Sequence, residues 1–343
     1  MTYLENSKQY TGSDLENIFF RPMLTGESAQ DLGVRVLYNM PQPTHVQLWD
    51  GQRNILQKFT SAGWAGGKAA TKYEKTVNLN RVKAELGFSA ANYFSMVYEK
   101  VSSLVNTHMD DLSGTELEQA ETALFKQALA ENIRVTMWIG DTSAASGYNT
   151  FDGLLKRING LVDDDGVYNF SYQAAALEDP AYVVELFDKL WAGADPRIPG
   201  LKADDRLAYF VSSDIYRLYE KYLDAKGADA AYADAMNGRR TLAYHGIPVV
   251  DVRLGSYLGA TSFRQSFVML TDRRNLVLAV NTADMPGNEV RMWYNPDEME
   301  NRQRAVFMAG TQILDEALIS FAYKQKKPGN AHPQGLSPRM PRP

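Results

Sequence analysis

The residues that come nearest to a recognised binding pattern lie at positions 63–69, where three glycines precede Lys68. Glycine-rich runs that end in a lysine can cradle phosphate with their backbone amides. Here the spacing between the glycines is one residue short, and Ala69 stands where a hydroxyl side chain should ligate magnesium. We therefore favour a flexible turn over a phosphate-binding loop.

Other candidate chemistry is equally incomplete. Residues 163–166 read Asp-Asp-Asp-Gly, but they lack the alternation and the distal glutamate of a calcium loop, so a solvated acidic turn is favoured. The four histidines share no metal-ligand spacing: His45, His108, His245 and His332. The chain has no cysteine and no Gly-x-Ser-x-Gly elbow. The sequence therefore predicts no catalytic, cofactor-binding or metal site. A soluble α/β hydrolase with an unrecognised carboxylate pair stays open as an alternative of another class.

The charge balance limits the partners. The 343 residues include 36 Lys and Arg against 41 Asp and Glu, a net charge of −5, so we expect only non-specific contact with DNA. An aromatic cluster has the residue types of a base-stacking platform, but the helical spacing of its last members favours a core or subunit contact: Tyr209, Phe210, Tyr216, Tyr219 and Tyr222. No apolar run approaches the roughly 18 residues of a membrane span, and the first residues lack the basic-then-apolar layout that is expected of a signal peptide. We expect synthesis in the cytoplasm and no membrane partner.

The first third of the chain predicts an arm, a hairpin and two helices. Residues 1–44 have scattered apolar groups between turn formers, which indicates an irregular arm. Residues 45–85 alternate apolar and polar side chains around a glycine-rich middle, as in a long β-hairpin with a flexible tip. Apolar spacing predicts a helix over 88–109, and Ser113 with Glu116 forms a capping box for a second helix over 113–132. Residues 134–139 are β-branched and aromatic, which predicts a strand that ends at Gly140.

The remainder predicts a mixed α/β module followed by long strands. Helices are expected over 182–191 and 214–223, and strands over 207–211, 247–252, 267–270, 276–280, 290–294, 304–314 and 318–323. A Pro- and Lys-rich tail begins at Lys324 and has almost nothing to bury. We expect other subunits to hold both this tail and the arm. The fold class is α+β.

This order of parts resembles the Hong Kong 97-type major capsid proteins of tailed bacteriophages. Three short strings carry the resemblance in detail: Phe-Asp-Gly-Leu-Leu-Lys-Arg-Ile at 151–158, Leu-Ala-Tyr-Phe-Val-Ser-Ser at 207–213 and Gly-Ile-Pro-Val-Val at 246–250. The resemblance implies an N-terminal arm (1–44), an extended loop (45–85), a peripheral domain (86–145 and 290–325) with a spine helix (113–132), an axial domain (146–289) and a C-terminal tail (326–343).

The resemblance also implies a function. Many copies of the chain would form hexamers and pentamers of an icosahedral head that encloses double-stranded DNA, which places the protein in the virion. Some family members begin with a long scaffolding segment, whereas this chain starts with the arm, so a separate scaffolding protein is expected. A portal is expected as well, and a decoration or cement protein is a further candidate partner. An encapsulin, which is a nanocompartment shell of the same architecture, stays open as an alternative.

The distribution of charge indicates where two subunits meet. Residues 45–85 carry seven basic and three acidic side chains, and residues 110–131 carry one basic and six acidic side chains. In the family, the extended loop of one subunit lies across its neighbour near the spine helix, so opposite charges could steer this contact. The expected contact residues are Trp64, Lys68, Lys72 and Lys75 on the loop and Glu116, Glu118 and Glu121 on the helix. Two independently solvated faces are the open alternative.

Overall fold

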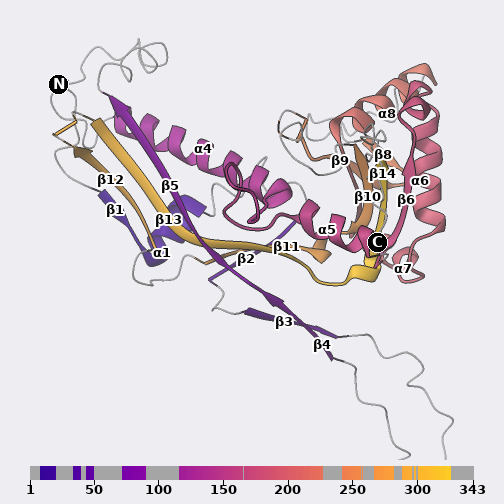
Figure 1. Cartoon of the computed structure of the whole chain (residues 1–343), viewed down its shortest axis with the longest axis horizontal. Coiled ribbons are helices and arrows are strands. Elements are labelled where there is room, and N and C mark those ends of the chain that lie inside the picture. The colour runs from indigo at the N-terminus through magenta and orange to yellow at the C-terminus, as the bar shows by residue number, and fades with distance from the viewer. Residues whose placement is uncertain are drawn as a thin grey trace, which may run out of the picture.

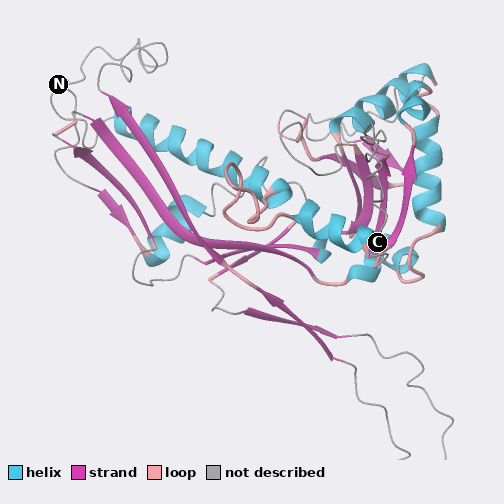
Figure 2. Cartoon of the chain, viewed as in Figure 1, coloured by secondary structure: helices cyan, strands magenta, loops and turns pink. Residues whose placement is uncertain are grey.

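The computed structural model describes residues 8–20, 34–39, 44–49, 72–89, 116–164, 166–226, 242–255, 257, 266–281, 288–295, 297–298 and 300–325. Two six-stranded sheets and a separate two-stranded hairpin organise these residues (Figures 1 and 2). The long helix α4 lies beside the first sheet, and helices α6 and α8 lie on the outer side of the second sheet (Figure 1). The predicted α+β class is confirmed.

The first sheet joins strands from both ends of the chain. Its order is β1 (Lys8–Tyr10), β12 (Glu289–Asn295), β13 (Glu300–Ile313), β11 (Leu276–Asn281) and β2 (Arg35–Tyr38), and β5 (Asn80–Ser89) pairs with β13 outside this order. Only β11 and β2 run parallel within it. The predicted strands at 276–280, 290–294 and 304–314 are confirmed. The predicted helix over 88–109 is wrong at residues 88 and 89, which belong to β5, and residues 90–109 lie outside the described part.

The described part of the expected arm is built into this sheet and its core. β1 and β2 pair with β12 and β11, and the intervening α1 (Gly12–Asp14) and π-helical turn η1 (Leu15–Phe20) lie between them in sequence. Leu15, Phe19 and Phe20 are fully buried, and the Phe20 ring packs edge-on against Phe307 at 5.0 Å. The expectation of an irregular arm is therefore wrong for residues 8–20 and 35–38, whereas the expectation that other subunits hold the arm stays a prediction. The spacing of Leu15 and Phe19 places both on one helical face, which finds its partner within the chain.

Helix α4 (Glu116–Ile139) is longer than predicted, and the strand predicted at 134–139 is wrong. Phe125, Leu129 and Ile133 lie four residues apart and pack into the main core, which they share with Phe307. From residue 133 to Gly140 every side chain is buried, because the end of the helix is covered by both sheets. Burial of this kind overrides the modest preference of Val135 and Thr136 for strands.

The sharp turn after α4 leads to a helix that the sequence reading missed, α5 (Leu154–Asp163). A Cβ on Gly140 would lie 2.2 Å from the carbonyl oxygen of Phe151, and one on Gly153 would lie 2.7 Å from the carbonyl oxygen of Trp138. Both glycines are therefore required by the close crossing of the two backbones. Phe151, Leu154 and Leu155 are buried in the main core. The string at 151–158 therefore turns the chain after α4 and attaches α5 to the core.

The second sheet forms the other half of the molecule. Its order is β6 (Tyr168–Tyr172), β14 (Ile319–Lys324), β10 (Phe267–Asp272), β7 (Leu207–Val211), β9 (Ile247–Asp251) and β8 (Leu242–Tyr244). Helices α6 (Tyr182–Ala192), α7 (Ile198–Lys202) and α8 (Ser213–Ala225) and the 3-10 turn η2 (Ala174–Glu178) accompany it. The two predicted helices and the strands at 207–211, 247–252, 267–270 and 318–323 are confirmed within two residues at each end. His245 and Gly246 both have positive φ and form the tight β8–β9 turn. Glycine adopts positive φ without strain, which explains the glycine at position 246.

Both faces of the second sheet are covered. Tyr209 and Val211 of β7 point into a core with Phe187 of α6 and Tyr219 of α8, whereas Ala208 and Phe210 point the other way into the core shared with α4. The Trp138 ring of α4 lies 5.7 Å from that of Phe210. The core interpretation of the aromatic cluster is thus confirmed for its buried members, which cannot stack on nucleic acid bases.

The chain crosses between the two sheets at two short turns. β10 continues through the 3-10 turn η5 (Arg273–Asn275) into β11, and β13 continues through η6 (Glu316–Leu318) into β14. As a result β11 lies in the first sheet and β14 in the second, which differs from the expected division at residue 290. Hydropathy identifies such strands but does not show which sheet they join, because pairing depends on long-range hydrogen bonds. Buried Arg134 of α4 adds a tie between the halves by donating to the carbonyl oxygen of Val252 at 2.9 Å.

Candidate functional site

A two-stranded hairpin projects from the body of the molecule. β3 (Thr44–Trp49) pairs antiparallel with β4 (Lys72–Val77) in a register that sets Thr44 opposite Val77 and Trp49 opposite Lys72. Figure 1 shows both strands leaving the first sheet on the side away from α4. The residues between them, 50–71, lie outside the described part. The described strands agree with the expected hairpin, although its second strand ends at Val77 and residues 80–85 belong to β5.

A small separate core anchors the base of this hairpin. Val46 and Val77 from the hairpin, with Leu79 after it, pack against Val277 and Ala279 of β11 and against Leu314. Val77 is fully buried and Leu79 is 4% exposed. This burial holds the two ends of the hairpin on the first sheet, so its direction is set by the body of the subunit.

Polar contacts join the same base to the strand β13 and the turn η6. The side-chain amide of Gln312 donates to the carbonyl oxygen of Thr76 at 2.8 Å, and Lys75 Nζ lies 2.5 Å from Glu316 Oε1. Both charged side chains are more than a third exposed, so their ion pair contributes at most about 1 kcal/mol. The hairpin is therefore linked to the segment that passes from one sheet to the other.

A close backbone crossing completes the anchor. A Cβ on Gly310 of β13 would lie only 2.2 Å from the carbonyl oxygen of Asn78, in the two-residue link between β4 and β5. No side chain fits there, so glycine is required for the chain to pass from the hairpin into the sheet at this angle.

The expected contact residues are distributed over separate parts of the chain. Trp64 and Lys68 lie outside the described residues, and of Lys72 only its place in β4 is described. Lys75 has a partner within its own chain, Glu316. The three acidic residues lie on the first turns of α4: Glu116, Glu118 and Glu121. The spacing of Glu118 and Glu121 places them on one helical face. The side chains of all three lie outside the described part. Of the hairpin, the described strands β3 and β4 leave the first sheet on the side away from α4 (Figure 1).

The sequence reading missed a groove beside α4. A cavity of about 490 Å³ lies between α4 and β5, with Phe125, Leu129 and Ile133 on one side and Val82 and Leu86 on the other. Leu86 is 36% exposed, and among the described residues β5 pairs with β13 alone. Among the described residues, this exposed leucine and an unpaired edge of β5 lie beside the apolar groove, which is a surface suited to another chain. The alternation of apolar and polar residues after position 80 was the available signal.

The metal-ligating residue types and the phosphate-loop-like string do not form a site in the part of the chain that the structure describes. No group of three or more His, Cys, Asp or Glu side chains there is placed to hold a metal ion. His45 lies beside Glu74 across the hairpin, with 2.6 Å between Nδ1 and Oε1, and Asp165 of the acidic run is outside the description. The phosphate-loop-like residues 63–69 also lie outside it. Among the described helices, none is long and apolar enough to span a membrane.

The strongest perturbation of an acidic group has a structural explanation. In the turn between α4 and α5, Lys156 Nζ lies 2.8 Å from Asp141 and 2.6 Å from Asp152. Hydrogen bonds from Lys156 and Ser143 lower the pKa of Asp141 to about 2. Burial raises the pKa of Asp152, but hydrogen bonds from Lys156 and Thr142 outweigh it, so this pKa is lowered as well. These contacts hold the turn in place. Because the pKa of each carboxyl group is lowered, neither group is suited to general acid catalysis near neutral pH.

No protein-family model matches the sequence, and no curated protein matches it. Among solved structures, the chain is similar to a chain from the satellite phage P4 procapsid including size determination (Sid) protein. The TM-score is 0.51 at 12% identity, over 89% of this chain and 97% of that chain. It is also similar to a chain of "Gordonia phage Cozz" (TM-score 0.46, 12% identity, 87% and 86% covered) and of the capsid of a native GTA particle (0.44, 12%, 88% and 92%).

Of these three similarities, the first has a TM-score above 0.5 and extends over nearly the whole of both chains. At 12% identity it shows the fold and nothing finer. The observed parts are those that the sequence led us to expect: a projecting hairpin, a long helix beside the first sheet, and a second sheet with helices outside it. The chain therefore has the Hong Kong 97-like fold of phage capsid proteins.

Proposed function

We propose that the chain is a major capsid protein, a structural subunit that assembles with many copies of itself into an icosahedral head around double-stranded DNA. The observation that carries this proposal is the hairpin, which is anchored at its base by a core of its own and projects away from the body (Figure 1). A projecting pair of strands has free edges, and natural proteins seldom leave such edges bare unless another chain covers them. The likeness of the fold to a chain of the P4 procapsid supports the same conclusion.

In this proposal each half of the chain has its own place in the shell. The first sheet with α4 forms the peripheral domain, α4 is the spine helix, and the second sheet with α6 and α8 forms the axial domain that meets its copies around hexamer and pentamer axes. A separate scaffolding protein, a portal and a decoration protein are the further partners that this role implies. DNA contact is non-specific, in keeping with the net charge of −5.

The finer proposal is that the hairpin of one subunit docks at the α4 side of its neighbour. The described strands of the hairpin leave the first sheet on the side away from α4 (Figure 1), and this supports the use of the opposite charges of hairpin and helix in a contact between copies. The groove between α4 and β5 offers apolar surface beside this helix, which suits a large apolar side chain such as Trp64. Charges then steer the approach, and apolar burial supplies the lasting contact.

Negative-stain imaging and size exclusion of the purified full chain test the main proposal. We expect closed shells, or pentamers and hexamers when scaffolding is missing. Shells that contain DNA and carry a portal vertex support a phage head, whereas small shells that enclose a protein cargo identify an encapsulin. A stable monomer that turns over a small substrate would contradict both and support the hydrolase alternative.

Charge reversal tests the docking proposal separately. Lys68→Glu with Lys72→Glu should slow assembly measured by light scattering and weaken its dependence on salt, and Glu118→Lys with Glu121→Lys should restore part of the rate. Lys75 is left unchanged because its ion pair with Glu316 would confound the result. Assembly curves that coincide with wild type at low and high salt would show that these charges have no part in docking.

A further inference from the structure

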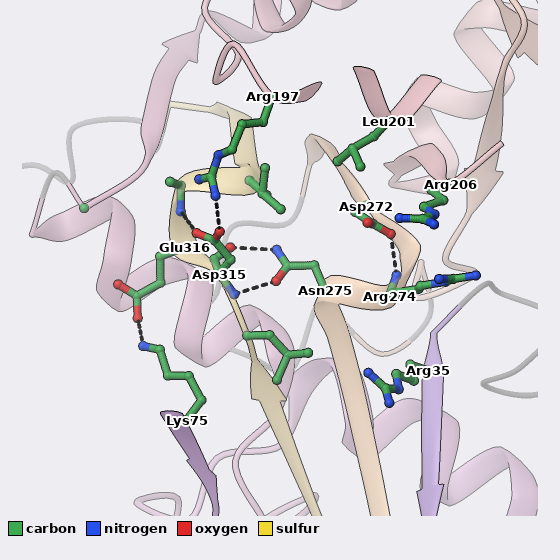
Figure 3. A pocket seen from close by; sticks show the side chains of 14 residues that line it. Arg35, Lys75, Arg197, Leu201, Arg206, Asp272, Arg274, Asn275, Asp315 and Glu316 are labelled. Carbon is green, nitrogen blue, oxygen red and sulfur yellow. Dashed lines mark hydrogen bonds and ion pairs between the residues drawn. The ribbon is translucent and has the colours of Figure 1, made fainter. Parts of the chain in front are cut away.

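A second cavity lies where the two sheets and the hairpin base meet (Figure 3). Its volume is about 840 Å³, within the range of small-ligand sites. Its lining comes from β2, β4, α7, η5 and η6, so segments distant in sequence converge on it. Five basic side chains line it, against three acidic ones: Arg35, Lys75, Arg197, Arg206 and Arg274, against Asp272, Asp315 and Glu316.

The acidic side chains of the cavity already have partners within the chain. Asp315 accepts from Arg197 at 2.8 Å and from the backbone amide of Ala317 at 3.0 Å. Glu316 is paired with Lys75. The remaining acid, Asp272, is 7% exposed and accepts from the backbone amide of Arg274 at 2.8 Å, as the cap of η5. These contacts neutralise Arg197 and Lys75 as well.

Three guanidinium groups are left with little or no compensation. In the described part of the chain, the side chains of Arg35 and Arg274 make no ion pair or hydrogen bond, and both residues are exposed. Arg206 has one ionic contact, 3.4 Å from Asp204, whose side chain is 52% exposed and does not line the cavity. In Figure 3 Arg206 and Arg274 lie on one side of the cavity, with Arg35 below them at the end of β2. Like charges around one cavity repel one another unless an anion lies between them.

We propose that this cavity binds the oxygens of linked phosphate groups, as in pyrophosphate or a nucleotide. Guanidinium groups present planar forks of donors that match phosphate oxygens, and arginine is preferred for this recognition. Three of them around one cavity suit a compact ligand with several negative charges. The phosphodiester backbone of DNA offers the same chemistry, but a concave site with carboxylates in its walls fits a small polyphosphate better than a duplex.

Thermal unfolding of the full-length, unassembled chain tests this site, with sodium pyrophosphate as the probe in a buffer without divalent cations. A ligand that binds the folded state raises the unfolding temperature in proportion to the logarithm of its concentration. We expect this rise for wild type and for the control Arg217→Gln, which removes an exposed arginine of α8 outside the cavity. Arg35→Gln with Arg274→Gln should weaken the apparent affinity at least tenfold.

The outcomes separate the possible sources of the anion. Competition by a short mixed-sequence DNA duplex would identify DNA phosphates as the occupant, and pyrophosphate binding without such competition would identify a free polyphosphate. Equal shifts in wild type and the double variant, or an equal shift with sodium chloride at matched ionic strength, would overturn the proposal. So would a double variant that blocks shell assembly although wild type binds no pyrophosphate, because the cavity would then receive carboxylates of a neighbouring copy.

Discussion

The anchor of the hairpin predicts a large effect from one added methyl group. In Gly310→Ala the new Cβ would lie 2.2 Å from the carbonyl oxygen of Asn78, whereas ordinary contacts of a Cβ lie at 3.4 Å or more. The backbone between β4 and β5 must therefore move by roughly 1 Å, and no flexible side chain can absorb the change. Overpacking of this kind costs about 1–3 kcal/mol. We expect a loss of that size in the free energy of unfolding of the unassembled chain.

The same change should alter assembly. Because Gly310 lies where the hairpin enters the first sheet, a shift there changes the direction in which the hairpin projects (Figure 1). A tilt at the base displaces the other ends of β3 and β4, at Trp49 and Lys72, and with them any contact that these strands make with another copy. We therefore expect slower light scattering and malformed shells in negative stain, even at a temperature where the variant is fully folded.

Gly160→Ala is the matched control. Gly160 lies in α5, is exposed, and would place its Cβ in open space. Alanine in a helix is more favourable than glycine by up to about 1 kcal/mol, so this variant should be as stable as wild type or more stable, and should assemble normally. If Gly310→Ala unfolds and assembles like Gly160→Ala, the two backbones do not approach as described and the anchoring argument is refuted.

Three further perturbations follow from single contacts. Arg134→Met should lower the free energy of unfolding in urea by about 2 kcal/mol because it leaves the carbonyl oxygen of Val252 without its buried donor, whereas the exposed Arg217→Met should change it little. Asp141→Asn should reduce the amount by which the free energy of unfolding falls when the pH is lowered from about 4 to about 2. The lowered pKa of Asp141 stabilises the fold above its ordinary pKa of 3.8, and this contribution, on the order of 1 kcal/mol, disappears as pH falls from about 4 to about 2, measured by thermal unfolding across that range. Lys75→Met should cost less than about 1 kcal/mol and should lose its effect in high salt, because the ion pair with Glu316 is solvent-exposed; a larger, salt-independent cost would show that the pair carries the anchor.

Local patterns predicted most elements of the second sheet. β7 and the helices α6 and α8 lie where apolar spacing places them, because each is bounded by turn-forming residues and buries a regular face. The same reasoning failed at residues 134–139, where β-branched side chains lie in a helix. The end of α4 is buried on all sides, and the benefit of that burial exceeds the preference of a few residues for extended backbone.

The parts that could not be predicted depend on contacts between distant segments. Nothing in the sequence of residues 8–20 shows that Phe20 packs on Phe307, so an amphipathic stretch was interpreted as part of a loose arm. The exchange of β11 and β14 between the sheets is likewise invisible in hydropathy, since either strand is apolar enough for either sheet. The cavity between the sheets also escaped notice, because Arg35, Arg206 and Arg274 are isolated charges until the fold brings them to one place.

The predicted contact between the hairpin and α4 also depends on features that only the fold shows. A basic hairpin and an acidic helix start can be predicted from the sequence, but the direction in which β3 and β4 leave the first sheet, away from α4, cannot. If the hairpin of one copy docks at α4 of the next, as proposed, the contact is head-to-tail and closes into a ring when the rotation between copies allows it. In that case the rotation between copies depends on the angle at which the hairpin leaves the sheet. Because Gly310, Val77 and Leu314 hold the base of the hairpin, the proposed assembly would depend on residues of the subunit core as well as on residues of its surface.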